Sequence, residues 1–209
     1  MTLELPDITE VCQSDTTVDG CRIRTGCNPT NAPSVSGGQI TLGTTPPTTV
    51  ASTAQPPGTV EYYDVNDFSP GQPVTFSIAG TGAVPAMAAS VPAPSQVTIT
   101  SNFDGTLVSK SSDYVLTWTG ATTGTLDLSV SAGIDGDFGL VDCPFPAAPG
   151  TGTISAAALQ MFPSGGLARF EVMNTAPQQA GEWTIEFGVG YDALWADGSF
   201  AQAVLNITN

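Results

Sequence analysis

Apolar and polar residues alternate along much of this chain, and no other feature of the sequence restricts the fold as strongly. In residues 182–191 every second side chain is large and apolar: Trp183, Ile185, Phe187, Val189 and Tyr191. Successive side chains of a β-strand point to opposite faces of the sheet, so a period of two predicts a half-buried strand. Shorter stretches of the same kind lie at 73–80, 87–91, 113–119, 125–132, 138–145, 168–174 and 201–208.

Glycine and proline separate these segments, with 23 and 17 copies respectively. Both residues suit tight turns and are costly inside helices. About ten to twelve short strands with turns between them predict an all-β fold, an antiparallel β-sandwich of the immunoglobulin-like or jelly-roll type. Trp118 is the expected core aromatic of a central strand. At most one short helix is expected, at 155–162, where Ser155 can cap the first turn.

Residues 1–38 lack strong periodicity and contain turn signals such as Asp19-Gly20 and Gly37-Gly38. We expect a disulfide-rich, stapled N-terminal segment over 1–38 and a β-sandwich domain over 39–209, in which a Thr- and Pro-rich stretch at 44–58 forms an extended loop. A subdivision near 95–101 is the alternative to one sandwich domain, because 209 residues accommodate one large or two small β-domains.

The four cysteines are Cys12, Cys21, Cys27 and Cys143, and they allow three disulfide pairings, among which sequence alone does not decide. We favour Cys12–Cys21, which closes a small loop, together with Cys27–Cys143, which ties the N-terminal segment to the main body. A zinc site is the weaker alternative, because the chain has no histidine and Cys143 is remote from the other three cysteines.

The charge of the chain excludes two classes of partner. Only four Lys and Arg residues stand against 19 Asp and Glu residues, which gives a net charge of −15. Nucleic acids and anionic lipids are bound through clusters of cations, so neither is an expected partner. No run of about 20 apolar residues is present to span a membrane.

The expected location is extracellular, on the cell surface or in the periplasm. Low lysine content, paired cysteines and Thr/Gly richness favour export. The residues after Met1 lack the basic start and apolar core of a signal peptide, so we expect Met1 to replace a removed export signal.

Catalysis is not expected. The absence of histidine removes the Ser-His-Asp and Cys-His arrangements as well as histidine-ligated metals. A Ser–Lys dyad would have to use Lys110, which lies among serines in a polar loop, where a lysine is a poor base. A carboxylate-dependent hydrolase is a further alternative. The conspicuous acidic residues, which include Asp64, Asp67, Asp192 and Asp197, lie at turns or strand ends, where Asp commonly forms the turn.

Two weaker site signals remain. Asp135, Asp137 and Asp142 cluster oxygen ligands around a glycine, which suits calcium, although their spacing is not that of an EF-hand loop and an ordinary Asp-Gly hairpin turn is the favoured interpretation. No other cofactor is expected.

Aromatic side chains provide the second signal. Trp195 lies in a loop, and Tyr62 and Tyr63 are adjacent in an expected strand, so one of the two points outward. Such side chains can stack on a sugar or anchor a partner; Trp195 can equally close the open end of the sandwich.

Several short motifs carry a resemblance to a known group of proteins: Gly38-Gln-Ile-Thr-Leu42, Pro70-Gly-Gln72, Val84-Pro-Ala-Met87, Leu116-Thr-Trp-Thr119, Cys143-Pro-Phe145 and Gly150-Thr-Gly-Thr-Ile154. The series resembles uncharacterised secreted proteins and lipoproteins of myxobacteria and related bacteria, over about residues 37–209. The resemblance implies a place at the cell envelope or outside it, where such relatives carry a lipid anchor ahead of a linker. Cys12 departs from that pattern, since the residues before it are not the small ones that precede a lipidated cysteine.

Three functions follow from these observations, in order of preference. The first is a non-catalytic extracellular or cell-envelope protein with a structural or adhesion role, which contacts a protein partner or assembles with itself. The second is a carbohydrate-binding module that uses Trp195 with Tyr62 or Tyr63, assisted by calcium. The third is the carboxylate-dependent hydrolase.

Overall fold

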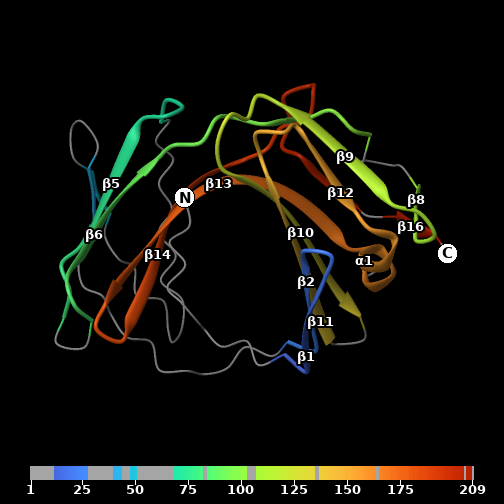
Figure 1. Ribbon diagram of the computed structural model, residues 1–209, viewed down its shortest axis with the longest axis horizontal. Helices are drawn as coiled ribbons and strands as arrows, with labels where there is room; N and C mark the ends of the chain where they lie inside the picture. Colours follow the sequence, from blue (N-terminus) through green and yellow to red (C-terminus); the bar gives the residue numbers. More distant parts are fainter. Residues whose placement is uncertain are drawn as a thin grey trace. The chain divides into compact units, whose positions relative to one another are not determined.

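A computed structural model describes residues 12–27, 40–43, 48–50, 68–81, 84–102, 107–134, 137–162, 165–204 and 206–208 (Figure 1). The chain forms two compact units. Unit 1 comprises Met1–Thr9, Pro29–Pro94 and Met173–Gly190, and unit 2 comprises Glu10–Asn28, Ser95–Val172 and Tyr191–Asn209. The division of the chain into 1–38 and 39–209 remains a prediction.

The larger sheet of unit 2 begins with an N-terminal hairpin. Its strands run in the order β1 (Ser14–Val18), β2 (Cys21–Thr25), β11 (Asp137–Pro146), β10 (Thr125–Ile134) and β13 (Leu167–Ala180), followed by β14 (Trp183–Asp192). The short strand β15 (Gln202–Val204) pairs antiparallel with the first residues of β13. Strands β13 and β14 are long enough to contribute residues to both units.

A second, smaller sheet faces the same core. It consists of β12 (Thr151–Ile154), β9 (Tyr114–Thr119) and β7 (Thr98–Ile99), with β9 in the centre. Its buried side chains Leu116 and Trp118 belong to one hydrophobic cluster with Leu126, Leu128 and Val130 of β10. Two sheets that bury their apolar faces against each other form a sandwich. The predicted all-β sandwich fold is therefore confirmed.

Trp118 occupies the predicted core position. Its side chain is 3% exposed and packs against Phe145 with a ring-centroid distance of 6.1 Å. The indole N–H donates a hydrogen bond of 2.7 Å to the carbonyl oxygen of Ala147. The one polar atom of this large side chain is thus satisfied, as burial requires.

The predicted short helix is also present, as α1 (Ala156–Met161). The hydroxyl oxygen of Ser155 accepts a hydrogen bond of 3.1 Å from the amide of Ala158, and a carboxylate oxygen of Asp113 accepts one of 2.8 Å from the amide of Ala156. Two of the amides that the first turn leaves without helical partners are thereby satisfied.

The described residues of unit 1 include an antiparallel sheet of four strands. Its order is β4 (Thr48–Val50), β3 (Ile40–Gly43), β5 (Pro73–Ile78) and β6 (Met87–Pro92). Alternate residues of β5 and β6 are buried, as the sequence pattern predicts: Val74, Phe76, Ile78, Met87, Ala89 and Val91. The ring of Phe187 from β14 lies 5.5 Å from that of Phe76 and extends this core.

The structure corrects the expected list of strands in four places. The described residues form 16 strands rather than about ten to twelve, because several are only two or three residues long. The supposed loop at 44–58 contains β4, and the N-terminal segment contains β1 and β2. Strand β8 (Leu107–Ser109) pairs in parallel with β16 (Asn206–Thr208), against the expectation of antiparallel pairs alone.

Candidate functional site

The N-terminal hairpin of unit 2 is held by a tight turn, two disulfides and two ion pairs. Asp19 and Gly20 link β1 to β2 with φ values of 47° and 87°. Two consecutive residues of positive φ form the type I′ turn, whose twist matches that of the flanking strands. Cys21 and Ile23 of β2 are buried, whereas Arg22 and Arg24 point to the opposite, outer face.

Two disulfides hold this hairpin, and the predicted pairing is wrong. The bonds are Cys12–Cys27 and Cys21–Cys143 rather than Cys12–Cys21 and Cys27–Cys143. The residues on the two sides of the hairpin face each other, so Cys12 just before β1 meets Cys27 just after β2. Cys21 lies at the turn, roughly six residues or 20 Å along β1 from Cys12, which is too far for a disulfide.

Strand register explains the second bond. Strand β2 pairs antiparallel with β11, with Val141 opposite Ile23 and Asp142 opposite Arg22. The next pair in this register is Cys143 opposite Cys21. The bond therefore joins neighbouring strands of one sheet, unlike the disulfide between the two sheets of antibody domains. All four predicted cysteines are disulfide-bonded, and such bonds indicate an oxidising environment.

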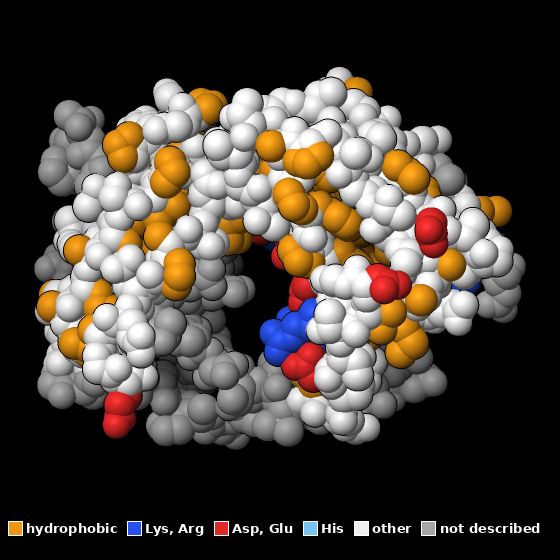
Figure 2. All heavy atoms as spheres, in the orientation of Figure 1, with side chains coloured by type: hydrophobic (Ala, Val, Ile, Leu, Met, Phe, Trp, Pro, Cys, Tyr) orange, Lys and Arg blue, Asp and Glu red, His pale blue; other side chains and the backbone are white. Residues whose placement is uncertain are grey.

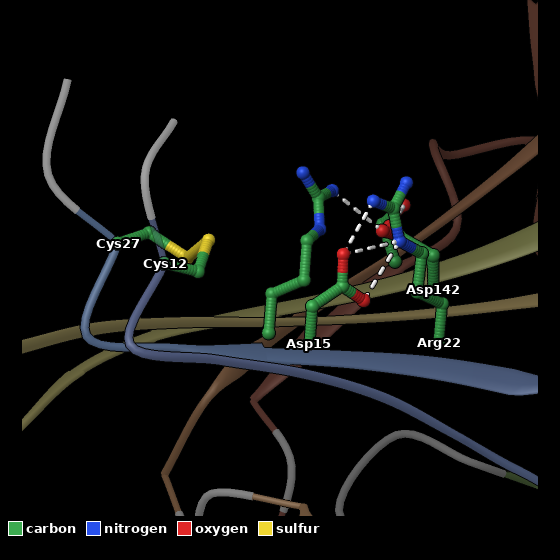
Figure 3. A network of polar contacts seen from close by, with 7 residues as sticks. Cys12, Asp15, Arg22, Cys27 and Asp142 are labelled. Carbon is green, nitrogen blue, oxygen red and sulfur yellow. Dashed lines mark hydrogen bonds and ion pairs between the residues drawn. A yellow bond between two sulfur atoms is a disulfide. The ribbon is translucent and has the colours of Figure 1, made fainter. Parts of the chain in front are cut away.

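Ion pairs cross-link the outer face of the same strands (Figure 3). The guanidinium of Arg22 pairs with Asp15 of β1 at 2.6 Å, and that of Arg24 pairs with Asp142 of β11 at 2.8 Å. Both pairs run diagonally, since Arg24 stands directly opposite Asp15, and Arg22 opposite Asp142. The hydrogen bond from Arg22 is the main cause that lowers the pKa of Asp15. Figure 2 shows basic side chains (blue) together with acidic ones (red).

Both carboxylate oxygens of Asp142 accept hydrogen bonds in this network. One carboxylate oxygen accepts from Arg24, and the other accepts a hydrogen bond of 3.0 Å from the hydroxyl of Ser129 on β10. Asp135 lies outside the described residues, and for Asp137 the structure describes only the backbone, which pairs with that of Ile134. Within the described part of the chain no group of three or more metal-ligating side chains occurs. Calcium binding at these aspartates stays a prediction.

Trp195 follows β14 in the chain and is half-buried. Its ring meets that of Phe170 edge-on at a centroid distance of 5.9 Å and packs against the core of unit 2. Its indole N–H points to the carbonyl oxygen of Gln202 at 3.4 Å. These contacts give Trp195 a role in packing, and its role in ligand binding stays a prediction. Tyr62 and Tyr63 lie outside the described residues.

An exposed aromatic near Trp195 was missed by the sequence analysis. Phe200 is 63% exposed, beside the turn in which the amide of Gly198 donates to the carbonyl oxygen of Trp195 at 2.9 Å. The signal was present in the sequence, because the alternation predicted over 201–208 puts Ala201 and Ala203 on the inner face and Phe200, Gln202 and Val204 on the outer face, where the structure exposes them.

The residues considered for catalysis have structural contacts. The ammonium of Lys110 donates a hydrogen bond of 3.2 Å to the carbonyl oxygen of Gln160 in the last turn of α1. Asp192 pairs with Arg169 at 2.6 Å. Asp197 accepts hydrogen bonds from the hydroxyl and the amide of Ser199, which lower its pKa. Asp64 and Asp67 lie outside the described residues.

Comparison with known proteins adds no relative. No protein-family model matches the chain, and the searches of curated proteins and of solved structures find no similar protein either. Among the described helical residues, no segment has the length and hydrophobicity that crossing a membrane requires.

Proposed function

We propose that this protein is a non-catalytic structural or adhesion module of the bacterial cell surface or of the extracellular space. The observation that carries the proposal is the double attachment of the N-terminal hairpin to the sandwich. Two disulfides and two ion pairs connect β1, β2 and β11 through side chains on both faces of the sheet, and the hydrogen bond from Ser129 to Asp142 adds β10.

Such cross-links suit a domain that bears load or meets proteases. A pull on the chain before Cys12 passes through the Cys12–Cys27 bond and does not peel β1 from β2. A pull that reaches β2 passes through Cys21 into β11 at Cys143. Resistance to forced unfolding and to proteolysis depends on how rarely the structure opens, and covalent links between strands reduce that opening.

The surface of unit 2 supports a role in contact with other molecules. Most of the described side chains on the face drawn in Figure 2 are uncharged. Large apolar side chains are exposed, and two of them, Leu167 and Val204, stand directly opposite each other on β13 and β15. Apolar neighbours on a surface favour association with a protein partner or with a second copy.

The test uses the full chain with both disulfides formed. Sedimentation velocity and electron micrographs measure assembly over a range of protein concentrations, and protein-coated fluorescent beads measure attachment to bacterial cells. We expect concentration-dependent assembly or saturable attachment, and neither for the reduced, alkylated chain. A protein that remains monomeric at every concentration and whose beads do not attach would contradict the proposal.

Carbohydrate binding is the second candidate, and the exposed ring of Phe200 favours it. An exposed aromatic face beside polar side chains such as Gln202 can stack on a sugar. A glycan array with the wild-type chain, Phe200→Ala and Trp195→Ala separates the two aromatics. Binding lost only in Phe200→Ala would support a sugar platform at this loop, and a flat wild-type array would exclude it.

A further inference from the structure

We propose that the exposed strand β1 joins two copies of this chain edge to edge, in an antiparallel pair around a two-fold axis at Thr16. The inference rests on the proposed structural function and names the assembly surface and the partner. The larger sheet of unit 2 would then continue from one copy into the next through β10, β11, β2 and β1.

Strand β1 has the character of an open edge. It ends the strand order of its sheet, and among the described strands it pairs with β2 alone. Residues Ser14 to Thr17 are all exposed. Natural edge strands are usually protected against pairing by proline, by lysine or by an inward-pointing charge. The sequence Ser14-Asp-Thr-Thr-Val18 has no proline or lysine, and its one charge, Asp15, is paired with Arg22 on the outer face of the sheet.

The hairpin turn determines which backbone groups face the open edge. In a two-residue type I′ hairpin the residues that flank the turn, here Val18 and Cys21, form a hydrogen-bonded pair. Hydrogen-bonded and non-bonded pairs alternate along an antiparallel ladder. The N–H and C=O groups of Asp15 and Thr17 therefore point away from β2, where another strand can pair with them.

Charge selects one register for two copies. An axis at Asp15 would place the two Asp15 carboxylates opposite each other, and an axis at Thr17 would place Asp15 opposite Asp19 of the second copy. An axis at Thr16 instead places Asp15 opposite Thr17 of the second copy, and Ser14 opposite Val18. Like charges directly opposite each other destabilise strand pairing, so the axis at Thr16 is favoured.

The disulfides lower the entropic cost of pairing at the β1 edge. They fix both ends of the hairpin, so little chain entropy is lost when β1 pairs. The opposing effect is the net charge of −15 on each copy. Because salt screens this repulsion, the proposed dimer should strengthen as ionic strength rises.

Substitutions at Thr17 test the charge pattern. Thr17→Asp would place a carboxylate opposite Asp15 of the second copy, twice per dimer, and should weaken the dimer about tenfold. Thr17→Lys should strengthen it. Thr119 is exposed on the central strand β9, so Thr119→Asp and Thr119→Lys make the same changes in net charge away from the edge. Sedimentation equilibrium measures all five proteins, and circular dichroism checks that each is folded.

Cysteine cross-linking tests the register itself. At the proposed axis the two Thr16 residues form a non-hydrogen-bonded pair with Cα atoms about 4.5 Å apart, which a disulfide can span. Thr16→Cys should therefore give a covalent dimer on mild oxidation of the folded protein, and Thr17→Cys should not.

The outcomes separate this inference from the proposed function. A dimer unaffected by Thr17→Asp, or a Thr16→Cys protein that forms no covalent dimer, would overturn the β1 interface while assembly or attachment to cells still supports the proposed function. If the wild-type protein forms no dimer at any concentration, the β1 interface is also overturned. The proposed function is then tested by the attachment of coated beads alone.

Discussion

At the level of single residues, Trp118 combines apolar packing with one directed hydrogen bond. Its ring fills the core beside Phe145, and its N–H satisfies the carbonyl oxygen of Ala147. Trp195 has the same chemistry in a half-buried position with a longer N–H contact of 3.4 Å. The two tryptophans therefore allow the stability contribution of a buried indole to be compared with that of a half-buried one.

Trp118→Phe should lower the free energy of unfolding by about 2–4 kcal/mol, because it removes buried volume and leaves the Ala147 carbonyl without this donor. Trp195→Phe is the matched control and should cost less than about 1 kcal/mol, since solvent can reach its site. Urea unfolding with the disulfides intact measures both. Equal losses in the two variants would contradict the assignment of Trp118 as the core aromatic.

Acid should destabilise the protein through Asp15 and Asp197, whose pKa values the fold lowers. A carboxyl group with a lowered pKa in the folded state stabilises the protein above its unfolded pKa of about 3.9, and this contribution disappears as the pH falls through the folded pKa. Stability should thus fall as the pH drops below about 4 and through the lowered pKa values of the folded state. Asp15→Asn and Asp197→Asn should each flatten that fall in denaturant titrations, whereas Asp19→Asn provides an exposed control.

The residue scale also shows where sequence reasoning reaches its limit. Trp118 and Ser155 were predicted correctly, because a strand pattern and a capping position are local signals. The role of Trp195 depends on Phe170 and on the carbonyl oxygen of Gln202, which become its neighbours only when strands from different parts of the chain pack. The network of Arg22, Arg24, Asp15 and Asp142 was missed for the same reason.

At the level of elements, the two disulfides close loops of very different size. Cys12 and Cys27 are 15 residues apart, and Cys21 and Cys143 are 122 apart. Loop-closure entropy predicts that loss of the short link costs about 3 kcal/mol and loss of the long link about 5 kcal/mol. The comparison is between the paired variants Cys12→Ala/Cys27→Ala and Cys21→Ala/Cys143→Ala, measured by thermal and urea unfolding. A larger loss for the first variant would contradict this ranking.

Strand prediction was reliable where alternation involved large apolar side chains, as in β5, β9, β10 and β14. It missed β1, β2, β4, β8 and β12. These strands are short and rich in Thr, Ser, Gly and Arg, so they contain too few large apolar residues to show a period of two. The Asp19-Gly20 turn and the alternation in Cys21-Arg-Ile-Arg-Thr25 were available as hairpin signals. The disulfide pairing could not follow from the sequence, because it depends on the register between β2 and β11.

At the level of the whole molecule, charge imbalance dominates the electrostatics. A net charge of −15 on 209 residues makes the folded chain repel itself, whereas the described ion pairs are largely at the surface and contribute little. Added sodium chloride should therefore raise the melting temperature, because screening relieves the repulsion more than it weakens the pairs. Melting curves at low and at moderate salt decide this; a melting temperature that falls with salt would show that the ion pairs matter more.

The interleaving of the two disulfides has a consequence for how the protein is made. A bond between Cys12 and Cys21, which are neighbouring cysteines in the sequence, would block both native bonds at once. Once such a bond has formed, the native connectivity is reached only by thiol–disulfide exchange or by reduction and renewed oxidation. We therefore expect a disulfide isomerase to raise the yield of correctly bonded protein when the reduced chain is oxidised.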